Sequence, residues 1–353
     1  MKMTRIALLL LLTTLYINGQ YAARQTGRVV HLEDSKNQME VTVIPTMGAQ
    51  AVEFKVKGTN ILRANRGSID DLLANPVSTG IPYRGPWFNR LDEHAFWANG
   101  KKYVFNDGLG NIRGAQAMSG FPMLDLENQF KLVEFKADSR AAWVTSKMDF
   151  YTHPDWMAQW PFAHTVEITY RLENGVLEVR TKVENLSIEP MPASFGWEPG
   201  FRLTDAPRDE WKLGIGARTT WLLTPAKIPN GEVRTVEEVY GTRQNLALKG
   251  LSLDNQFADF ERDAAGRSLF RLQGRQQKID FLVGPHWQAM GIFAPDPATN
   301  RQAAQTGGFV ALEPMTAITN GLNLAHRGVY KELQMIPPGK SMEESFWIRP
   351  SGF

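Results

Sequence analysis

The chain of 353 residues contains no cysteine. This absence excludes a disulfide framework, a thiolate zinc site and a lipid-modified cysteine. The sequence also lacks a charge imbalance, since 39 lysines and arginines face 37 aspartates and glutamates, and it has no long basic block. Proteins that bind nucleic acid usually carry such a block. The composition therefore gives no indication of a nucleic-acid partner and favours a neutral or weakly charged ligand.

Local motifs for metal binding and acyl transfer are missing as well. No two of the six histidines lie at the three- to five-residue spacing of a local ligand pair, and there is no G-x-S-x-G turn. We therefore expect neither a dedicated histidine metal site nor an acyl-enzyme hydrolase. The histidines are His31, His94, His153, His164, His286 and His326.

The one strongly apolar run lies at the N-terminus. Lys2 and Arg5 precede the apolar residues 6–12, and mostly small and polar residues follow as far as Ala23. This order is typical of a secretory signal, so we expect residues 1–23 to be a signal peptide and the protein to be exported to the periplasm or the extracellular space. Tyr21 stands where a small residue is preferred for a cut after Ala23, and an uncleaved membrane anchor is the alternative.

The rest of the chain is dominated by period-two alternation of apolar and polar residues, which is typical of strands with one buried face. The segment Glu173-Asn174-Gly175 between two such patterns predicts a hairpin. Helical patterns are scarce, and residues 68–74 are the best candidate, with Ser68 as cap. Because no repeat and no linker is visible, we predict an all-β protein whose residues 24–353 form one large β-sandwich domain. The alternating segments are residues 39–45, 51–58, 141–150, 164–172, 176–185, 278–284 and 344–350.

Three carboxylates stand in unusual surroundings: Glu198 in FGWEPGF, Asp254 in LSLDNQF and Glu313 in FVALEPM. Leaving a buried polar group without a partner costs on the order of 2–7 kcal/mol, so each of them is exposed, paired or functional. Because proline follows Glu313, we expect a strand to end there. The alternatives without function are a strand-end glutamate bonded to loop N–H groups for Glu313 and an Asx-turn for Asp254.

Two basic residues are also conspicuous, Arg90 in PWFNRLDEH and Arg113 in GNIRGAQ. For each of them a surface salt bridge is the alternative to a role in a site. Arg90 belongs to residues 75–100, which contain three prolines and two tryptophans and are the most loop-like part of the sequence. We expect this segment to help form a site, since functional residues are often carried by loops.

Taken in order, these segments resemble the aldose 1-epimerase (galactose mutarotase) family over nearly the whole mature chain. The opening strands and the arginine-bearing loop are matched by PTMGAQAVEFKVKGTNIL and GPWFNRLDEHAFWANGKKY. The central block is similar to WPFAHTVEITYRLENGVLEVRTKVENLSIEPMPASFGWEPGF. The sugar-binding aspartate motif and the catalytic glutamate segment resemble LSLDNQF and FVALEPMTAITNGLN.

The resemblance implies a galactose mutarotase-like supersandwich enzyme that interconverts the α and β anomers of a free aldose. In this reaction a base takes the proton of the anomeric hydroxyl, an acid protonates the ring oxygen, and the open aldehyde rotates and recloses without a cofactor. Carried over by position, Glu313 would be the base, Asp254 would bind sugar hydroxyls, and Arg90 would hold a hydroxyl or the ring. Proton transfer of this kind typically contributes ~10²–10⁴ in rate.

The sequence departs from the family at two positions. The family's usual acid is a histidine in a motif like glycine, aromatic, His, Pro, and here Glu198 stands at that position. A second family histidine corresponds to Arg113, which we predict to be the ion-pair partner of Glu198. The change alters the chemistry because a free glutamate, with a pKa of about 4.3, is ionised at neutral pH, whereas histidine titrates near pH 6.5.

Three hypotheses follow from this departure. In the first, Glu198 and Glu313 face each other, the like charges raise one pKa, and a protonated Glu198 is the acid. In the second, a displaced histidine such as His94, His153 or His286 supplies the proton. In the third, the pocket binds a sugar or an oligosaccharide, or performs another reaction on it, such as isomerisation, elimination or hydrolysis. The sequence leaves the oligomeric state open.

Overall fold

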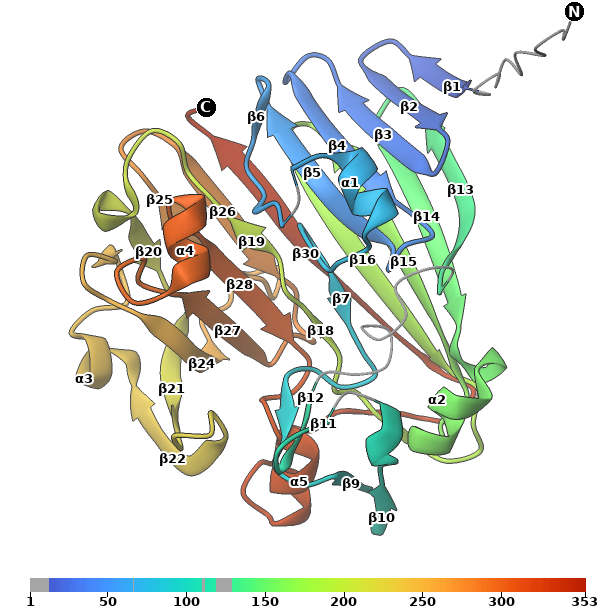
Figure 1. Cartoon of the computed structure of the whole chain (residues 1–353), viewed down its shortest axis with the longest axis vertical. Coiled ribbons are helices and arrows are strands. Elements are labelled where there is room, and N and C mark those ends of the chain that lie inside the picture. Colours follow the sequence, from blue (N-terminus) through green and yellow to red (C-terminus); the bar gives the residue numbers. More distant parts are fainter. Residues whose placement is uncertain (1–12, 66, 110–111, 119–128) are drawn as a thin grey trace, which may run out of the picture.

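The computed structural model describes residues 13–65, 67–109, 112–118 and 129–353. Most of the described elements are β-strands, and the three larger sheets form two layers (Figure 1). One layer is a nine-stranded sheet in the order β13-β14-β15-β16-β30-β26-β25-β20-β23. The second layer consists of a six-stranded and an eight-stranded sheet, each packed on one part of the nine-stranded sheet. The structure thus confirms the prediction of an all-β sandwich.

The nine-stranded sheet carries the predicted hairpin, in which Glu173 of β15 pairs with Val176 of β16. Its strands are β13 (Lys131–Ala137), β14 (Ala142–Asp149), β15 (His164–Glu173), β16 (Val176–Asn185), β30 (Ser341–Ser351), β26 (Lys278–Val283), β25 (Ser268–Gln273), β20 (Lys212–Gly214) and β23 (Leu246–Ala247).

The six-stranded sheet is a meander in sequence order, and the eight-stranded sheet brings together strands from distant parts of the chain. The first contains β1 (Thr13–Asn18), β2 (Tyr21–Thr26), β3 (Val29–Asp34), β4 (Met39–Ile44), β5 (Gln50–Val56) and β6 (Thr59–Asn60). The second contains β22 (Pro229–Thr235), β21 (Ala217–Leu223), β24 (Leu253–Phe260), β27 (Ala289–Ala294), β28 (Val310–Met315), β18 (Gly196–Trp197), β7 (Tyr83–Arg84) and β19 (Gly200–Phe201).

Short elements make up the rest of the described structure. Residues 69–74 form the predicted helix, and the Ser68 side chain accepts a hydrogen bond from Asp71 N at its start. The small sheets contain β8 (Arg90–Leu91), β11 (Ile112–Arg113) and β12 (Gln116–Met118), then β9 (Ala95–Ala98) with β10 (Lys101–Val104), and β17 (Met191–Pro192) with β29 (Met335–Ile336). The helices are α1 (Ile69–Ala74), α2 (Pro154–Gln159), α3 (Val236–Tyr240), α4 (Arg301–Thr306) and α5 (Gly321–His326), with short 3₁₀ turns at Asp107–Leu109, Phe150–Thr152 and Arg208–Glu210. In the described part of the chain, no helix has the length and apolar character that a membrane crossing requires.

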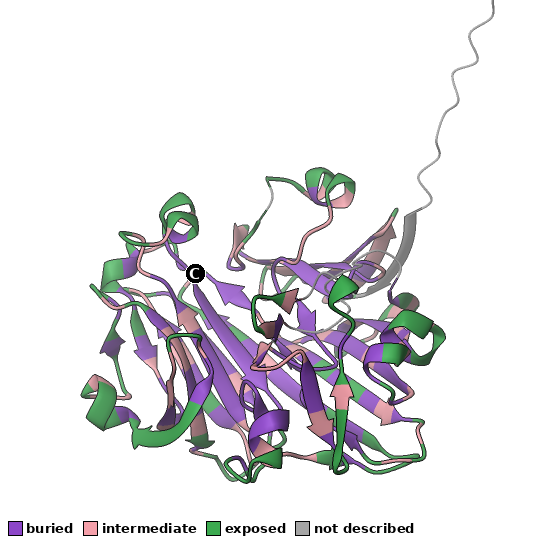
Figure 2. Cartoon of the chain, turned by 60° about the horizontal axis from the view of Figure 1, so that its bottom comes forward, coloured by how far each residue is buried: buried purple, intermediate pink, exposed green. Residues whose placement is uncertain are grey.

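The core lies between the two layers, where the buried side chains of the strands gather, while many turns and helices at the rim are exposed (Figure 2). Trp197 of β18 and Phe201 of β19 point inward and contact Phe346 and Phe281 of the nine-stranded sheet, with ring centroids 5.6 Å and 5.8 Å apart. Side chains alternate between the two faces of a strand. Glu198, next to Trp197, therefore projects from the outer face of the eight-stranded sheet.

The prediction that a strand ends at Glu313 is wrong, because β28 continues through Pro314 to Met315. The N–H groups of Leu312 and Thr316 donate to Pro199 O and Phe195 O of the neighbouring segment. Backbone N–H groups two residues apart in a strand point the same way, so the backbone nitrogen of Pro314, which carries no hydrogen, also points toward that segment. It does so where the segment is interrupted between β18 and β19. A proline is tolerated there because the sheet ladder is already broken.

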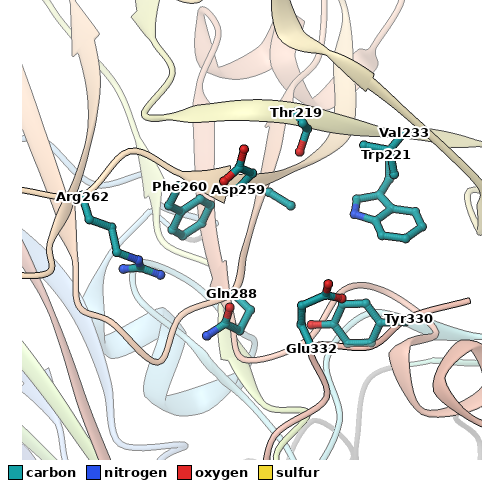
Figure 3. Close-up of a pocket in the computed structure, with 10 residues that line it drawn as sticks. Thr219, Trp221, Val233, Asp259, Phe260, Arg262, Gln288, Tyr330 and Glu332 are labelled. Atoms are coloured by element: carbon teal, nitrogen blue, oxygen red, sulfur yellow. The ribbon is translucent and has the colours of Figure 1, made fainter.

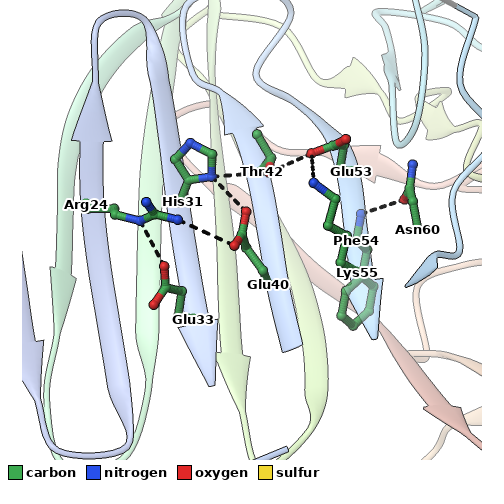
Figure 4. A network of polar contacts seen from close by, with 9 residues as sticks. All are labelled: Arg24, His31, Glu33, Glu40, Thr42, Glu53, Phe54, Lys55 and Asn60. Atoms are coloured by element: carbon green, nitrogen blue, oxygen red, sulfur yellow. Dashed lines mark hydrogen bonds and ion pairs between the residues drawn. The ribbon is translucent and has the colours of Figure 1, made fainter. Parts of the chain in front are cut away.

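The outer face of the six-stranded sheet carries a polar network that spans β2 to β5 (Figure 4). Arg24 bonds to Glu33 at 2.8 Å, and His31 Nδ1 lies 3.0 Å from the Glu40 carboxylate. The hydrogen bond from His31 is the main reason that the pKa of Glu40 is lowered. Cross-strand pairs of this kind hold the register of a sheet face that is open to solvent.

Strands β1 and β2 contain part of the predicted signal peptide. Tyr21 is buried, and its hydroxyl accepts a hydrogen bond from Asn174 N at 3.0 Å. Ala23 is also buried in the core. Residues 1–12 lie outside the described residues, and removal of residues 1–23 stays a prediction.

Candidate active site

A pocket of about 230 Å³ opens on the outer face of the eight-stranded sheet. All five residues that the sequence nominated line it: Arg90, Arg113, Glu198, Asp254 and Glu313. They come from β8, β11, the β18–β19 connection, β24 and β28. Sequence reasoning missed the other lining residues, which are Arg84, Phe88, Asn89, Met118 and Phe293. Three of those five belong to the segment 75–100 that was expected to help form a site.

The two glutamates lie opposite each other on neighbouring strands. Gly196 pairs with Met315, and Gly200 pairs with Ala311. Residues 197–199 therefore run opposite residues 312–314 without a shift in register. The middle residues of these stretches are Glu198 and Glu313. Directly opposed residues have Cβ atoms about 4.5–5.5 Å apart, and like charges in such a pair repel each other.

Glu313 is the carboxyl whose proton affinity is most affected by this arrangement. It is only 8% exposed, and its pKa is raised well above the ordinary value. Burial is the main cause, and the nearby charges of Glu198 and Asp254 add to it, whereas Arg84 and Arg90 act in the opposite direction. A buried carboxyl facing another carboxylate binds its proton more tightly. Glu313 is therefore suited to hold a proton that a free glutamate would lose.

Glu198 is held in an ion pair with Arg84. Arg84 Nε and Nη2 donate to Glu198 Oε2 at 2.9 Å and 2.6 Å, and Arg84 Nη1 donates to Ser78 at 2.8 Å. Arg84 pairs with Gly196, two residues before Glu198, so the side chains of Arg84 and Glu198 lie on the same face of the sheet. The predicted partner Arg113 lines the pocket but is replaced in this pair by Arg84. The arginine side chain is 6% exposed and the glutamate side chain 32%, so the ion pair is partly buried.

Arg90 and Asp254 lie on other walls of the pocket. Arg90 Nη1 donates to the side chain of Asn89 at 2.8 Å. Asp254 lies in β24 rather than in a turn, and its carboxylate is 3.3 Å from Lys227 Nζ. These charged groups can bind the hydroxyls of a polar ligand from several directions.

All six histidines lie in the described residues, and none of them lines the pocket. His94 contacts Asp107 at 2.9 Å and the carbonyl of Gly114 at 2.7 Å. His286 contacts Gln334 at 3.0 Å, and His153 stacks on Trp156. The geometry gives no support to the hypothesis of a displaced histidine.

The sequence matches the model of the family described as aldose 1-epimerase over residues 28–349. The chain belongs to the aldose 1-epimerase family. Within this family it carries a glutamate and an arginine at the two positions where the resemblance implies histidines, and both of them line the pocket.

Solved structures of similar proteins share the fold. A galactose mutarotase-like protein from Clostridium acetobutylicum superposes with a TM-score of 0.75 at 19% identity, covering 97% of this chain and 99% of the other. For an Escherichia coli K12 protein described as a putative aldose 1-epimerase, the TM-score is 0.66 at 18% identity, covering 97% and 100%. For galactose 1-epimerase from Lactobacillus acidophilus it is 0.65 at 15% identity, again covering 97% and 100%. At these identities the likeness concerns the galactose mutarotase-like sandwich fold.

Proposed function

We propose that this member of the aldose 1-epimerase family interconverts the α and β anomers of a free aldose in the pocket of Glu198 and Glu313. The observation that carries the proposal is the opposition of these two residues. Glu313 has a raised pKa, and Glu198 is held as the partner of an arginine. Such a pair offers one acid and one base at the same pH.

The proposed reaction needs only these two groups. The anomeric oxygen and the ring oxygen are bonded to the same carbon, so two neighbouring carboxyl groups can reach both from one side. The Glu198 carboxylate takes the proton of the anomeric hydroxyl while Glu313 gives its proton to the ring oxygen. The bond from the anomeric carbon to the ring oxygen breaks, and a carbonyl forms. Rotation of the aldehyde and the reverse proton transfers then close the ring as the other anomer.

This assignment exchanges the starting roles expected from the sequence, where Glu313 was the base and Glu198 the acid. The reason is electrostatic, because burial and the facing carboxylate raise the pKa of Glu313. The two roles alternate in any case, since ring closure uses each group in the opposite sense from ring opening. Arg90, Arg113 and Asp254 would hold the sugar hydroxyls. The pocket volume of about 230 Å³ lies below the range of roughly 300–1,000 Å³ typical of drug-sized ligands, which suits a single sugar.

The test is polarimetry on freshly dissolved α-glucose and α-galactose and on a panel of other aldoses. The proposal predicts that the protein accelerates equilibration of at least one of them, with methyl glycosides, which have no free anomeric hydroxyl, as the unreactive control. If no aldose responds while calorimetry shows saturable binding that is lost in Glu198→Gln/Glu313→Gln, the pocket is a carbohydrate-binding site. If glycosidic bonds are cleaved instead, it belongs to a different carbohydrate-active enzyme. On the basis of residues 1–23 we further propose that the protein acts outside the cytoplasm.

A further inference from the structure

A second pocket, of about 450 Å³, lies on the same outer face of the eight-stranded sheet (Figure 3). Among the described residues, none lines both this pocket and the pocket of Glu198 and Glu313. Its walls come from β21, β22, β24 and the segments around residues 262, 288 and 330–332. Its volume lies within the range of roughly 300–1,000 Å³ that is usual for small-molecule sites.

The register of the sheet fixes how the two pockets are related. Glu313 pairs with Gly291, Gly291 with Gln256, and Gln256 with Trp221, so these four residues form one row on one face. Three strand spacings of about 4.8 Å separate the two ends of the row, roughly 14 Å in all. Between the ends, Thr319 N donates to Gln256 Oε1 at 2.8 Å, so the segment around Thr319 crosses the row and divides the two pockets.

One side of the second pocket is aromatic. Trp221 and Tyr330 meet edge to face, with ring centroids 6.3 Å apart, and Phe260 lies on the opposite wall. Arg262 also lines the pocket, and hydrogen bonds to the backbone carbonyls of Gly284 at 3.0 Å and Trp287 at 2.8 Å fix its guanidinium while leaving its charge in place. Trp221 and Tyr330 are largely buried, 8% and 4% exposed, so they close this side of the pocket with an apolar wall.

The rest of the lining is mainly polar and rich in hydrogen-bond acceptors. Asp259 and Glu332 approach the space from opposite sides, together with Thr219 and Gln288 (Figure 3). Asp259 Oδ1 accepts from Arg218 at 3.2 Å, and Glu332 Oε2 accepts from Lys331 N at 3.0 Å. The remaining oxygens, Asp259 Oδ2 and Glu332 Oε1, accept no hydrogen bond from the described part of the chain. Both can therefore accept a hydrogen bond from a ligand.

These features select a class of ligand. The two carboxylates outnumber the Arg262 cation among the lining residues and disfavour a phosphate or another anion. The described residues hold no group of three or more acidic or histidine side chains arranged for a metal ion. The polar wall is unsuited to a purely apolar molecule. A sugar ring has both an apolar face, which can pack on an aromatic side chain, and hydroxyl groups that donate to carboxylates.

We propose that this second pocket is a carbohydrate-binding site that holds one pyranose unit, with its apolar face on the Trp221–Tyr330 corner and its hydroxyls on Asp259 and Glu332. The site stands apart from the anomer-converting pocket and does not depend on the activity proposed for it. Because the segment around Thr319 divides the two pockets, each takes its own sugar unit.

The test uses methyl pyranosides and oligosaccharides whose reducing ends have been reduced, since neither has a free anomeric hydroxyl. Calorimetry and saturation-transfer NMR should detect saturable binding of at least one of them. This binding should persist in the double variant Glu198→Gln/Glu313→Gln and weaken at least tenfold in Trp221→Ala and in Glu332→Gln. The matched controls, Trp143→Ala on β14 and Glu261→Gln beside Arg218, should bind as wild type.

Wild-type binding in both Trp221→Ala and Glu332→Gln would overturn the proposal, as would the absence of binding by every probe. Loss of binding only in the Glu198→Gln/Glu313→Gln variant would place the sugar in the first pocket and also refute it. If circular dichroism shows that Trp221→Ala does not fold, sugar binding is measured in Glu332→Gln and Thr219→Val instead. Wild-type binding in both of these variants would then overturn the proposal. Polarimetry on Trp221→Ala separates the two proposals, because the rate of anomer conversion should not change there.

Discussion

Glu198 and Glu313 lie directly opposite each other on the outer face of the eight-stranded sheet, one paired with Arg84 and the other buried. Burial is the main cause of the raised pKa of Glu313, and the facing charge of Glu198 adds to it, because two opposed carboxylates cannot both ionise without a cost.

The first prediction concerns stability as a function of pH. The pKa of the Glu313 carboxyl is higher in the folded protein than its unfolded value of about 4.3. Protonation of Glu313 therefore stabilises the folded state fully below pH about 4.3, and this stabilisation is lost as the pH rises through the folded pKa. Replacing Glu313 with Gln removes this loss. Thermal unfolding should show Glu313→Gln gaining on wild type as pH rises from 4 to 9, by roughly 1–2 °C for each kcal/mol recovered in a chain of this size. A constant difference between the two proteins across that range would contradict the assignment.

A second prediction follows the proton on Glu313 directly. Infrared difference spectra should show a protonated carboxyl band that persists above the ordinary titration range of a glutamate and is absent in Glu313→Gln. In Glu198→Gln the facing charge is gone, so the same band should disappear at lower pH than in wild type. A band that titrates identically in wild type and Glu198→Gln would show that the two residues are not coupled.

The ion pair of Arg84 provides a third prediction. Arg84→Gln leaves Glu198 without its partner in a partly buried place, so we expect a loss of about 1–3 kcal/mol in the free energy of unfolding. Because Arg84 also lowers the pKa of Glu313, that pKa should rise further. Chemical denaturation and the infrared titration measure the two effects. Arg113→Gln is the matched control for stability, and an equal loss there would favour the partner that the sequence suggested.

Gly291 gives a fourth prediction, because it makes room for the Glu313 carboxyl. A Cβ added at Gly291 would lie 2.5 Å from Glu313 Oε2, and the glycine has an ordinary backbone conformation that alanine can adopt. Gly291→Ala should therefore fold but displace the carboxyl, and a displacement near 1 Å can cost about 10²-fold in rate. Kinetics of anomer conversion should show the loss. Gly67→Ala, where an added Cβ meets nothing within 4 Å, is the control.

The N-terminal strands give a fifth prediction. A chain beginning at Arg24 lacks the buried Tyr21 and Ala23, whereas a chain beginning at Gln20 keeps both. Loss of a buried aromatic side chain costs on the order of 3–5 kcal/mol. Denaturation of the two chains should show the shorter one to be less stable by several kcal/mol. Equal stability would show that cleavage after Ala23 leaves the sandwich intact.

Much of the fold and of the site could be predicted from the sequence. Alternation identified β4, β5, β14, β15, β16, β26 and β30. The Asn174-Gly175 turn gave the β15–β16 hairpin, and family resemblance nominated five residues that share one pocket. The sequence could not show Arg84 as the partner of Glu198, because that pairing depends on the register between strands more than 100 residues apart in the chain. The same holds for Pro314, which continues a strand only because the neighbouring segment is interrupted beside it.

Anomer exchange measured by NMR in an equilibrated aldose solution tests the central claim most directly. With the aldose that responds in polarimetry, wild type should exchange the α and β anomeric signals faster than buffer, and Glu313→Gln should lower that rate by ~10²–10⁴. Glu344→Gln, which alters another buried carboxyl of raised pKa on β30, should retain the wild-type rate. Undiminished exchange in a folded Glu313→Gln protein would contradict the account.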